Sequence, residues 1–426
     1  MSHHELRISQ PGLRELVRQF QSPRELRLLC NVGRLTHGDQ RRWLVHALHP
    51  APSTRPRLLV VGEEDPSRVE AAVRKGVGDA GWNEETLVLS LGLGRALGRL
   101  AAAWCFQDRV EPVQQFVLVG SGWLRLPQSN ADFWPSTPAG PPLEELLSRT
   151  IGALGLATFR TLRQLTVAVI GCGRIGSLVA ELLASVGVAR LTLVDADCLE
   201  LHNLGEMAGV ELEDFGKPKV AALARGIRRG AVGRGTDIRT VIEPVDTLTA
   251  LFAVKTADIL VSCADSAAAR LAAAVLASSY LQPLLDLGTG ILPDGLGRRM
   301  GADVRLVLPG RCLVCWGGLV DLAAAAAALL AGRQEPPPAD FRDQRLGSLR
   351  SLNGLASSLG VTLLEQFLAG RLSESAWLQL DVNTTGVPQL THQTPPPAPA
   401  CPLCTLAGRG DAALEDLPTV LRQLGE

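Results

Sequence analysis

Four cysteines form two short pairs that are suited to metal binding. The pairs are Cys312-Leu313-Val314-Cys315 and Cys401-Pro402-Leu403-Cys404. A Cys-x-x-Cys spacing lets both thiolates of a pair reach one ion, and four sulfurs complete a closed, tetrahedral zinc site. The alternative is a set of redox disulfides, which are uncommon in a reducing compartment. We therefore predict a structural zinc ion that fastens the C-terminal segment to the preceding domain.

A glycine-rich turn is the second place where chemistry is expected. Gly171, Gly173 and Gly176 follow the pattern G-x-G-x-x-G directly after an apolar segment. Such glycines permit a tight turn, so that a phosphate can bind the unpaired N–H groups at the start of the next helix. Asp195 ends the next apolar segment, where a carboxylate can accept hydrogen bonds from ribose hydroxyls. The pattern predicts a nucleotide site, and a turn that binds no nucleotide is the alternative. It does not distinguish ATP from NAD.

Further motifs, in a fixed order along the chain, make the sequence resemble the ThiF/MoeB/HesA-type adenylyltransferases, which are related to ubiquitin-activating enzymes. The resemblance runs from Arg149 to Cys404. Beside the glycine turn and the cysteine pairs, it rests on Arg149-x-x-x-Ala153-x-Gly155, Asp195-Ala196-Asp197, Asn203-Leu204, Gly216-Lys217-Pro218-Lys219, and Ala264-Asp265-Ser266 with Arg270. Each motif alone is weak, but the ordered set is specific.

The resemblance implies a reaction and its participants. The C-terminal carboxylate of a ubiquitin-like or sulfur-carrier protein, usually ending in Gly-Gly, attacks the α-phosphate of ATP and releases pyrophosphate. ATP, Mg²⁺ and Zn²⁺ are the implied cofactors. This chemistry requires no covalent enzyme group, because it depends on holding the triphosphate in line and neutralising its charge.

The resemblance also implies catalytic roles for three residues. Lys219 matches the lysine that contacts the phosphates, and Asp265 matches the acid that helps to place Mg²⁺. Arg149 matches an arginine that reaches the partner's ATP site in family dimers, which implies a homodimer. The implied nucleotide pocket further contains Gly171, Gly173, Arg174, Gly176, Asp195, Asp197, Asn203 and Lys217.

Each of these residues also has a purely structural interpretation. Lys217 and Lys219 would belong to a solvated helix start, and Asp265 would cap the helix that follows it. A cap at Asp265 is compatible with metal binding. Arg149 would form a surface ion pair.

Three positions depart from the family pattern. Glu206 stands where the family usually has a phosphate-binding arginine, His202 replaces a usual serine, and Arg174 replaces a usual glycine in the turn. Arg174 would supply the positive charge that Glu206 removes. A second hypothesis is therefore a catalytically weakened scaffold that binds a ubiquitin-like protein or peptide without adenylating it. A third hypothesis is an NAD-dependent oxidoreductase, but the sequence has no identifiable hydride-transfer residues.

A catalytic cysteine is missing from its usual place. Many ubiquitin-activating relatives carry, between the two metal-binding pairs, a cysteine that receives the activated protein as a thioester. No cysteine lies between Cys315 and Cys401. We therefore expect no thioester there, as in the branch of the family that only adenylates.

Apolar segments separated by helical stretches predict the scaffold. Segments 166–170, 190–194, 259–262 and 283–286 are strand-like, and 177–186 and 322–331 are helix-like. Buried strands that alternate with helices of ten or more residues are typical of parallel α/β sheets. The expected fold class is α/β, with a Rossmann-like, mostly parallel sheet, helices on both faces and the four-cysteine zinc site.

A smaller α/β domain is expected before this sheet. Segments 57–61 and 115–119 predict strands, and 67–74 and 95–104 predict helices. We divide the chain into an accessory domain at 1–134, a proline-rich linker at 135–146, a ThiF-type domain at 147–410 and a tail at 411–426. The strand pattern faintly resembles JAB/MPN metalloproteases, but His46 and His49 have the wrong spacing for that zinc site. We therefore expect the N-terminal domain to have a non-catalytic role.

The composition and net charge of the chain indicate which classes of partner it can bind. The chain has 426 residues, 46% of them hydrophobic and 20% charged, and a formal net charge of −1. This charge offers no broad basic field for nucleic acid or an anionic membrane. No signal peptide or membrane-spanning run is evident, so we expect a cytoplasmic protein with small-molecule and protein partners.

Overall fold

The computed structural model describes most of the chain in two compact units. The described residues are 3–19, 27–30, 32–46, 57–61, 86–91, 100–106, 109–120, 122–127, 145–230, 235–294, 297–319, 321–331, 347–382, 386–395 and 400–425. Unit 1 comprises Met1–Pro135 with Ser278–Leu281 and Leu406–Leu417. Unit 2 comprises Ser136–Ala277, Gln282–Thr405 and Pro418–Glu426. Each unit is described by itself.

Unit 1 contains two described sheets and a helix. The sheets have the strand orders β10-β9-β1-β4-β3 and β2-β5-β6-β7-β8. The elements are β1 (His3–Ser9), α1 (Gln10–Gln19), β2 (Arg27–Cys30), β3 (Gly33–His37), β4 (Gln40–Val45), β5 (Arg57–Val61), β6 (Thr86–Leu91), β7 (Leu100–Phe106), β8 (Arg109–Pro112), β9 (Gln115–Gly120) and β10 (Gly122–Pro127). The expected smaller α/β part is thus present.

The helix expected over 95–104 is wrong for residues 100–104, which are the part of it that the structure describes. Residues 100–104 belong to β7, which pairs with β6 and β8, and not to a helix over 95–104. Ala102 and Trp104 are buried on the same face of this strand. A short apolar run fits either periodicity, and strand pairing decides between them. The helix expected at 67–74 lies outside the described residues.

Unit 2 is built on an eight-stranded sheet. Its order is β13-β12-β11-β14-β15-β16-β17-β18. The strands are β11 (Thr166–Ile170), β12 (Arg190–Val194), β13 (Asp237–Val241), β14 (Ile259–Ser262), β15 (Leu284–Asp294), β16 (Gly297–Val307), β17 (Ala376–Val382) and β18 (Pro388–Gln393). The first five strands in this order pair in parallel and the last three join antiparallel. The parallel part has the doubly wound order of Rossmann-like folds.

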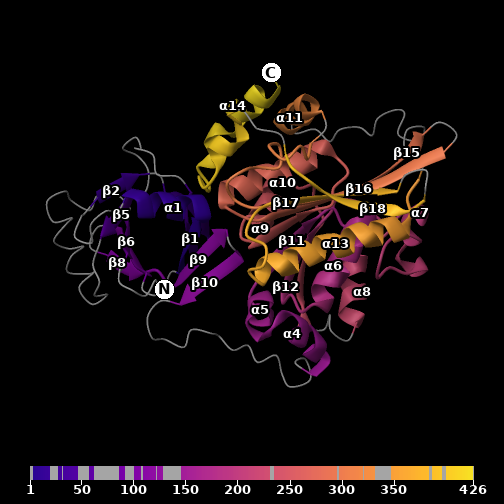
Figure 1. Ribbon diagram of the computed structural model, residues 1–426, viewed down its shortest axis with the longest axis horizontal. Coiled ribbons are helices and arrows are strands. Elements are labelled where there is room, and N and C mark those ends of the chain that lie inside the picture. The colour runs from indigo at the N-terminus through magenta and orange to yellow at the C-terminus, as the bar shows by residue number, and fades with distance from the viewer. Residues whose placement is uncertain are drawn as a thin grey trace. The chain divides into compact units, whose positions relative to one another are not determined.

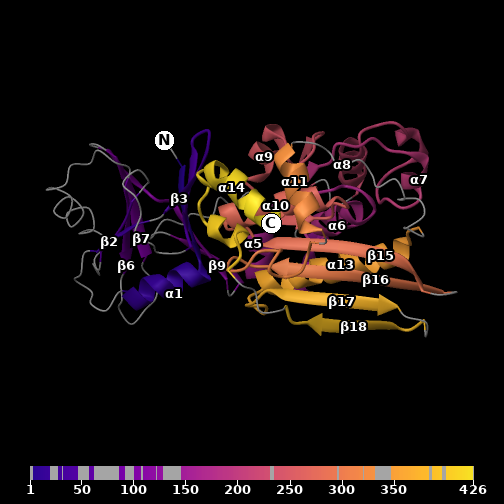
Figure 2. The same ribbon diagram turned by 90° about the horizontal axis from the view of Figure 1, so that it is seen from above.

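Helices flank this sheet (Figures 1 and 2). They are α4 (Ser148–Leu154), α5 (Leu156–Leu162), α6 (Arg174–Ser185), α7 (Leu201–Leu204), α8 (Lys219–Arg229), α9 (Leu248–Val254), α10 (Ala267–Tyr280), α11 (Leu322–Ala331) and α13 (Arg350–Leu368), with 3-10 turns Leu212–Asp214 and Leu403–Leu406. The last helix, α14 (Ala413–Gly425), begins in unit 1 and ends in unit 2. Because βαβ crossovers are right-handed, the strand order places α6 and α8 on one face of the sheet and α9 and α10 on the other. The predicted fold class is confirmed.

The centre of the sheet is apolar and dry. Val167, Ala168 and Val169 of β11 have no exposed surface, and neither do Ile259, Leu260 and Val261 of β14. Parallel strands covered on both faces read as continuous apolar runs for this reason. None of the described helices combines the length and apolar character needed to cross a membrane.

A buried histidine links the two sheets of unit 1. The His4 ring lies between the rings of Trp43 and Trp104, with centroids 6.3 and 5.4 Å away. Trp43 Nε1 donates to His4 Nδ1 (3.2 Å), so the ring proton is on Nε2, which donates to Glu111 Oε2 at 2.8 Å. Burial lowers the pKa of His4, although Glu111 opposes this effect. His4 is therefore neutral at neutral pH.

This arrangement predicts acid sensitivity. The unfolded chain takes up a proton at His4 near pH 6.5, before the folded chain does, so stability falls as the pH decreases through this value. Between pH 7.5 and 5.5, thermal melting should show a loss of about 1 kcal/mol that His4→Gln removes. The control is exposed His37→Gln, which should melt with the wild-type pH profile. An unchanged profile in His4→Gln would contradict the assignment.

Candidate functional site

Close backbone contacts in the glycine turn leave no room for a side chain at Gly171 or Gly176. A Cβ at Gly176 would lie 1.9 Å from the Gly171 carbonyl oxygen, and a Cβ at Gly171 would lie 2.7 Å from Ala264 N. Gly171 also has φ 82°, which favours glycine. Gly173, the N-cap of α6, has nothing within 4 Å of its Cβ position. The turn therefore presents the open N-terminus of α6, where an anion can bind.

Asp195 ties the end of β12 to this turn. Its Oδ2 accepts a hydrogen bond from Cys172 N (2.7 Å) and its Oδ1 accepts one from Asp197 N (2.9 Å). Burial raises the pKa of Asp195, while Lys219 and these N–H groups oppose the rise. Each carboxylate oxygen still has lone pairs that could accept a hydrogen bond from a ribose hydroxyl.

Lys219 is delivered to the same place by local backbone pairing. Lys219 N donates to Asp197 O (2.9 Å) and Leu199 N donates to Lys217 O (2.8 Å). The ammonium of Lys219 lies 2.7 Å from Asp197 Oδ2, with the lysine side chain 12% exposed and the aspartate 69%. Burial alone would lower the pKa of Lys219, but the charges of Asp195, Asp197 and Asp265 raise it above its ordinary value. Lys219 is therefore a largely buried cation.

Asp265 lies in the connection between β14 and α10 and is exposed. Its charge acts on Lys219, which places the two groups in one electrostatic environment. Ser266, the next residue, caps α10 by accepting a hydrogen bond from Ala269 N at 3.3 Å. The structure therefore brings the glycine turn, Asp195, Asp197, Lys219 and Asp265 together at the carboxyl ends of β11, β12 and β14.

Other predicted residues have local partners or lie apart. Lys217 Nζ donates to Asp214 Oδ1 (3.1 Å), and Asn203 Oδ1 accepts from Glu200 N (3.0 Å) within its own helical turn. Arg174 is the first residue of α6 and is half-buried. Arg149 is exposed on α4, and no described contact joins it to the nucleotide residues.

The carboxylate of Glu206 is held by hydrogen bonds from neighbouring side chains. Its Oε2 accepts hydrogen bonds from Ser348 Oγ (3.3 Å) and Asn353 Nδ2 (3.4 Å). Asn353, which is 1% exposed, also accepts from Thr289 Oγ1 through its Oδ1 at 2.8 Å. Neutral donors from the segment before α13 and from α13 thus hold the carboxylate that replaces the family's arginine.

Sequence reasoning missed the acid that anchors Lys217. Asp214 has no exposed surface and pairs with Lys217 and Arg225. Burial by itself raises the pKa of Asp214, but hydrogen bonds from Arg225, Glu211 N and Lys217 lower it to about 2. The spacing of Asp214 and Lys217 was a visible signal for this pair, but the contribution of Arg225 from α8 was not.

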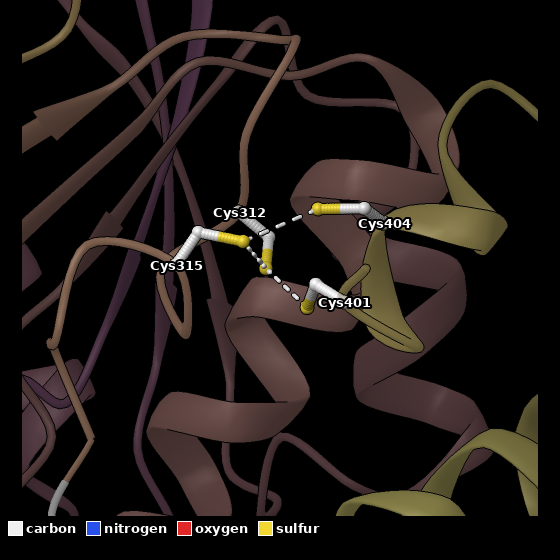
Figure 3. A group of neighbouring side chains, drawn as sticks. All are labelled: Cys312, Cys315, Cys401 and Cys404. Carbon is white, nitrogen blue, oxygen red and sulfur yellow. Dashed lines mark hydrogen bonds between the residues drawn. The ribbon is translucent and has the colours of Figure 1, made fainter. Parts of the chain in front are cut away.

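The four cysteines of the two pairs meet in space (Figure 3). Their sulfurs all lie within 4.8 Å of one another, and three sulfur pairs are 3.7, 3.6 and 3.5 Å apart. A tetrahedral zinc ion about 2.3 Å from each sulfur holds them about 3.8 Å apart, so the cluster fits this ion. Mutual contacts lower the pKa of Cys315 and Cys401 and raise the pKa of Cys312 and Cys404, as is expected where neighbouring thiols share protons. The cluster could hold zinc.

The glycine contacts predict a sharp effect of one methyl group. Gly176→Ala should destabilise unit 2 by about 2–3 kcal/mol and weaken nucleotide binding, because the new Cβ overlaps the Gly171 carbonyl. Urea denaturation is the measurement. Gly152→Ala is the control, because its Cβ position in α4 is open. Equal stability of the two variants would contradict the close approach.

Loss of one sulfur should release the metal. Cys404→Ser is expected to reduce bound zinc from about one equivalent per chain and to lower Tm by about 5–10 °C, since metal binding contributes to folding free energy. Elemental analysis and calorimetry measure these quantities. Exposed Cys198→Ser is the control. Full zinc content in Cys404→Ser would show that the cluster is not the binding site.

Comparison with known proteins places these features in a family. Residues 147–403 match the ThiF family. The tRNA threonylcarbamoyladenosine dehydratase of Bacillus subtilis is 42% identical over 73 residues, which are 17% of this chain and 29% of that protein. The adenylyltransferase and sulfurtransferase MOCS3 of Bos taurus is 32% identical over 117 residues, or 28% and 25% of the two chains. Escherichia coli MccB in complex with ATP matches at 20% identity and a TM-score of 0.46, covering 62% of this chain and 76% of MccB.

The curated relatives are matched over only part of their length. The first of them is covered over 29% of its own chain and the second over 25%. The family match is broader, because it spans more than half of the present chain and contains the glycine turn, Asp195, Lys219, Asp265 and three of the four cysteines. The predicted family is confirmed: the chain belongs to the ThiF family.

Proposed function

We propose that this chain is an ATP-dependent adenylyltransferase that activates the C-terminal carboxylate of a ubiquitin-like or sulfur-carrier protein. The observation that carries the proposal is the convergence of Asp195, Lys219 and Asp265 on the open N-terminus of α6. This group offers a ribose acceptor, a cation for phosphate and an acid for Mg²⁺ in one place. Family membership agrees with adenylation.

The proposed reaction is an in-line displacement at phosphorus. A carboxylate oxygen of the carrier forms a bond to the α-phosphorus while the bond to the bridging oxygen breaks, and pyrophosphate leaves with that electron pair. The N–H groups of the glycine turn and the Lys219 ammonium stabilise the charge on the phosphates. Mg²⁺ held near Asp265 would supply further positive charge when bound. No protein nucleophile is required.

Arg174 and Arg149 complete the proposed site. Arg174 begins α6 and is half-buried beside the glycine turn. It is therefore available to take the phosphate-binding part that Glu206 cannot take. We assign Gly171, Gly173, Gly176, Asp197, Asn203 and Lys217 to the walls of the nucleotide pocket. Arg149 would act across a homodimer, because it is exposed and lies apart from its own chain's site.

The fate of the product follows from the cysteine positions. No cysteine lies between Cys315 and Cys401, so we propose that the acyl-adenylate passes directly to an external acceptor. The two thiols nearest the glycine turn, Cys172 and Cys263, are poor nucleophiles, because burial raises the pKa of both above the usual range. Residues 1–134 would serve as a non-catalytic accessory domain, joined by a linker at 135–146 to the ThiF domain at 147–410.

Pyrophosphate exchange tests the activity. With Mg²⁺ and small carrier proteins that end in Gly-Gly, the wild type should incorporate labelled pyrophosphate into ATP. Asp265→Ala and Lys219→Ala should each reduce the rate about 100-fold, because each removes one electrostatic contribution. Asp237→Asn, an exposed acid on β13, is the matched control and should leave exchange unchanged.

A scaffold without adenylation is the second candidate, favoured by Glu206 in place of an arginine. It would bind a ubiquitin-like protein or peptide but show no magnesium-dependent binding of ATP in calorimetry. Binding of a carrier together with the absence of both exchange and Mg-ATP binding would replace the enzyme proposal with this one. Glu206→Arg, which restores the family's charge, would then be expected to gain ATP binding.

A further inference from the structure

A buried charge cluster links two strands and a helix of unit 2 and takes no part in the proposed reaction. Asp286 of β15 has no exposed surface. It accepts hydrogen bonds from both forks of Arg270, with Nε to Oδ1 at 3.0 Å and Nη2 to Oδ2. Arg305 Nη1 lies 3.9 Å from the same Oδ2. Charges buried so completely are costly unless they are paired, so the geometry of each group depends on the other two.

Arg305 occupies the centre of this cluster. In the sheet register it stands opposite Asp286 on one side and Trp377 on the other. Its guanidinium lies over the Trp377 ring at 4.1 Å, and its side chain is 5% exposed. The same group donates from Nε to Trp316 O (3.2 Å) and from Nη2 to Gly317 O (3.3 Å). Nη2 also lies 3.4 Å from Asp303 Oδ1, so several contacts together hold the guanidinium of Arg305 in place.

The two carbonyls that Arg305 contacts belong to the metal-binding turn. Trp316 and Gly317 directly follow Cys315, and their N–H groups bond back to Leu313 O and Val314 O at 3.1 and 3.0 Å. Gly317 has φ 61°, so the direction of its carbonyl is set by the turn. A zinc ion on Cys312 and Cys315 would hold this turn and therefore these two acceptors.

The other end of the cluster holds the start of α10. Arg270 lies in the first turn of this helix, and its N–H donates to Ser266 O at 3.1 Å. Asp265 immediately precedes Ser266. The fork between Arg270 and Asp286 therefore fixes the segment that carries Asp265 against β15.

We propose that Arg270, Asp286 and Arg305 are positioning residues that couple the four-cysteine metal site to the Mg-ATP side of the nucleotide site. The proposal rests on the proposed function, because it uses Asp265 as the magnesium-binding acid. The Trp316 and Gly317 carbonyls, held in place when zinc is bound, would fix the guanidinium of Arg305. Arg305 and Asp286 would then fix the position of Arg270 and of the start of α10. Coupling between two binding sites is reciprocal, so Mg-ATP must in turn strengthen zinc retention.

The experiment measures this reciprocity at equilibrium and without a carrier protein. The zinc affinity of the full chain is measured by competition with the zinc-selective chelator TPEN, with and without Mg-ATP. In the wild type, saturating Mg-ATP should raise the zinc affinity about fivefold. Arg305→Met should abolish this increase, and Arg305→Lys should restore it in part, because a lysine keeps the charge but loses the fork.

Arg299→Met is the matched control. Arg299 lies on the same strand and makes the same kind of paired contact to β17, with Nε and Nη2 at 3.1 and 3.0 Å from Asp381. In the sheet register Arg299 stands opposite Leu292, whereas Arg305 stands opposite Asp286. This variant should keep the full fivefold increase in zinc affinity. Loss of the increase in both variants, or in neither, would overturn the proposal.

Hydrogen exchange in the wild type separates this proposal from the proposed function. Removing zinc should accelerate amide exchange in residues 265–275 while 148–154 stay unchanged, and this readout needs neither ATP nor a substitution. If Mg-ATP fails to bind the wild type, adenylation fails, and the exchange result still decides the coupling. Unchanged exchange at 265–275 after zinc removal overturns the coupling even where ATP binds.

Discussion

The proposed nucleotide site depends on one close backbone approach, that of Gly176 to the carbonyl of Gly171. No side chain fits between them, since a Cβ would lie 1.9 Å from the oxygen. This contact bends the chain from β11 into α6 so sharply that the helix begins at Arg174 with its N–H groups open. Asp195 then fastens the turn through Cys172 N, which aligns the end of β12 with it. Everything proposed for ATP requires this geometry.

Charge around this turn is arranged in opposed pairs. Lys219 is paired with Asp197, and Lys217 is paired with buried Asp214. Glu206, the acid that reverses the family's charge, is held by Ser348 and Asn353. A carboxylate that accepts hydrogen bonds from neutral donors is stabilised where it lies. This orientation of Glu206 is compatible with a functioning phosphate site, provided that Arg174 supplies the missing cation.

The metal cluster and the nucleotide turn lie on different parts of one sheet, and the antiparallel extension joins them. β15 continues the parallel sheet through its pairing with β14, and pairs on its other edge with β16. Asp286, Arg305 and Trp377 stand opposite one another across β15, β16 and β17. A row of charged and aromatic side chains across three strands would stiffen this extension, as the proposed coupling requires.

Ordered short motifs were sufficient to predict the α/β class, the glycine turn, the cysteine cluster and the family, because such motifs specify local backbone geometry. The sequence also predicted β11, β12, β14 and the start of β15, since buried parallel strands are continuous apolar runs, but it did not predict β13 or the antiparallel strands β16, β17 and β18. It was wrong at 100–104, where a short apolar run was compatible with helix and strand alike. The partners of Glu206 and the meeting of Arg270, Asp286 and Arg305 became apparent only in the folded chain. These contacts join residues far apart in the chain, and no local spacing specifies which distant side chains a sheet register will place opposite one another.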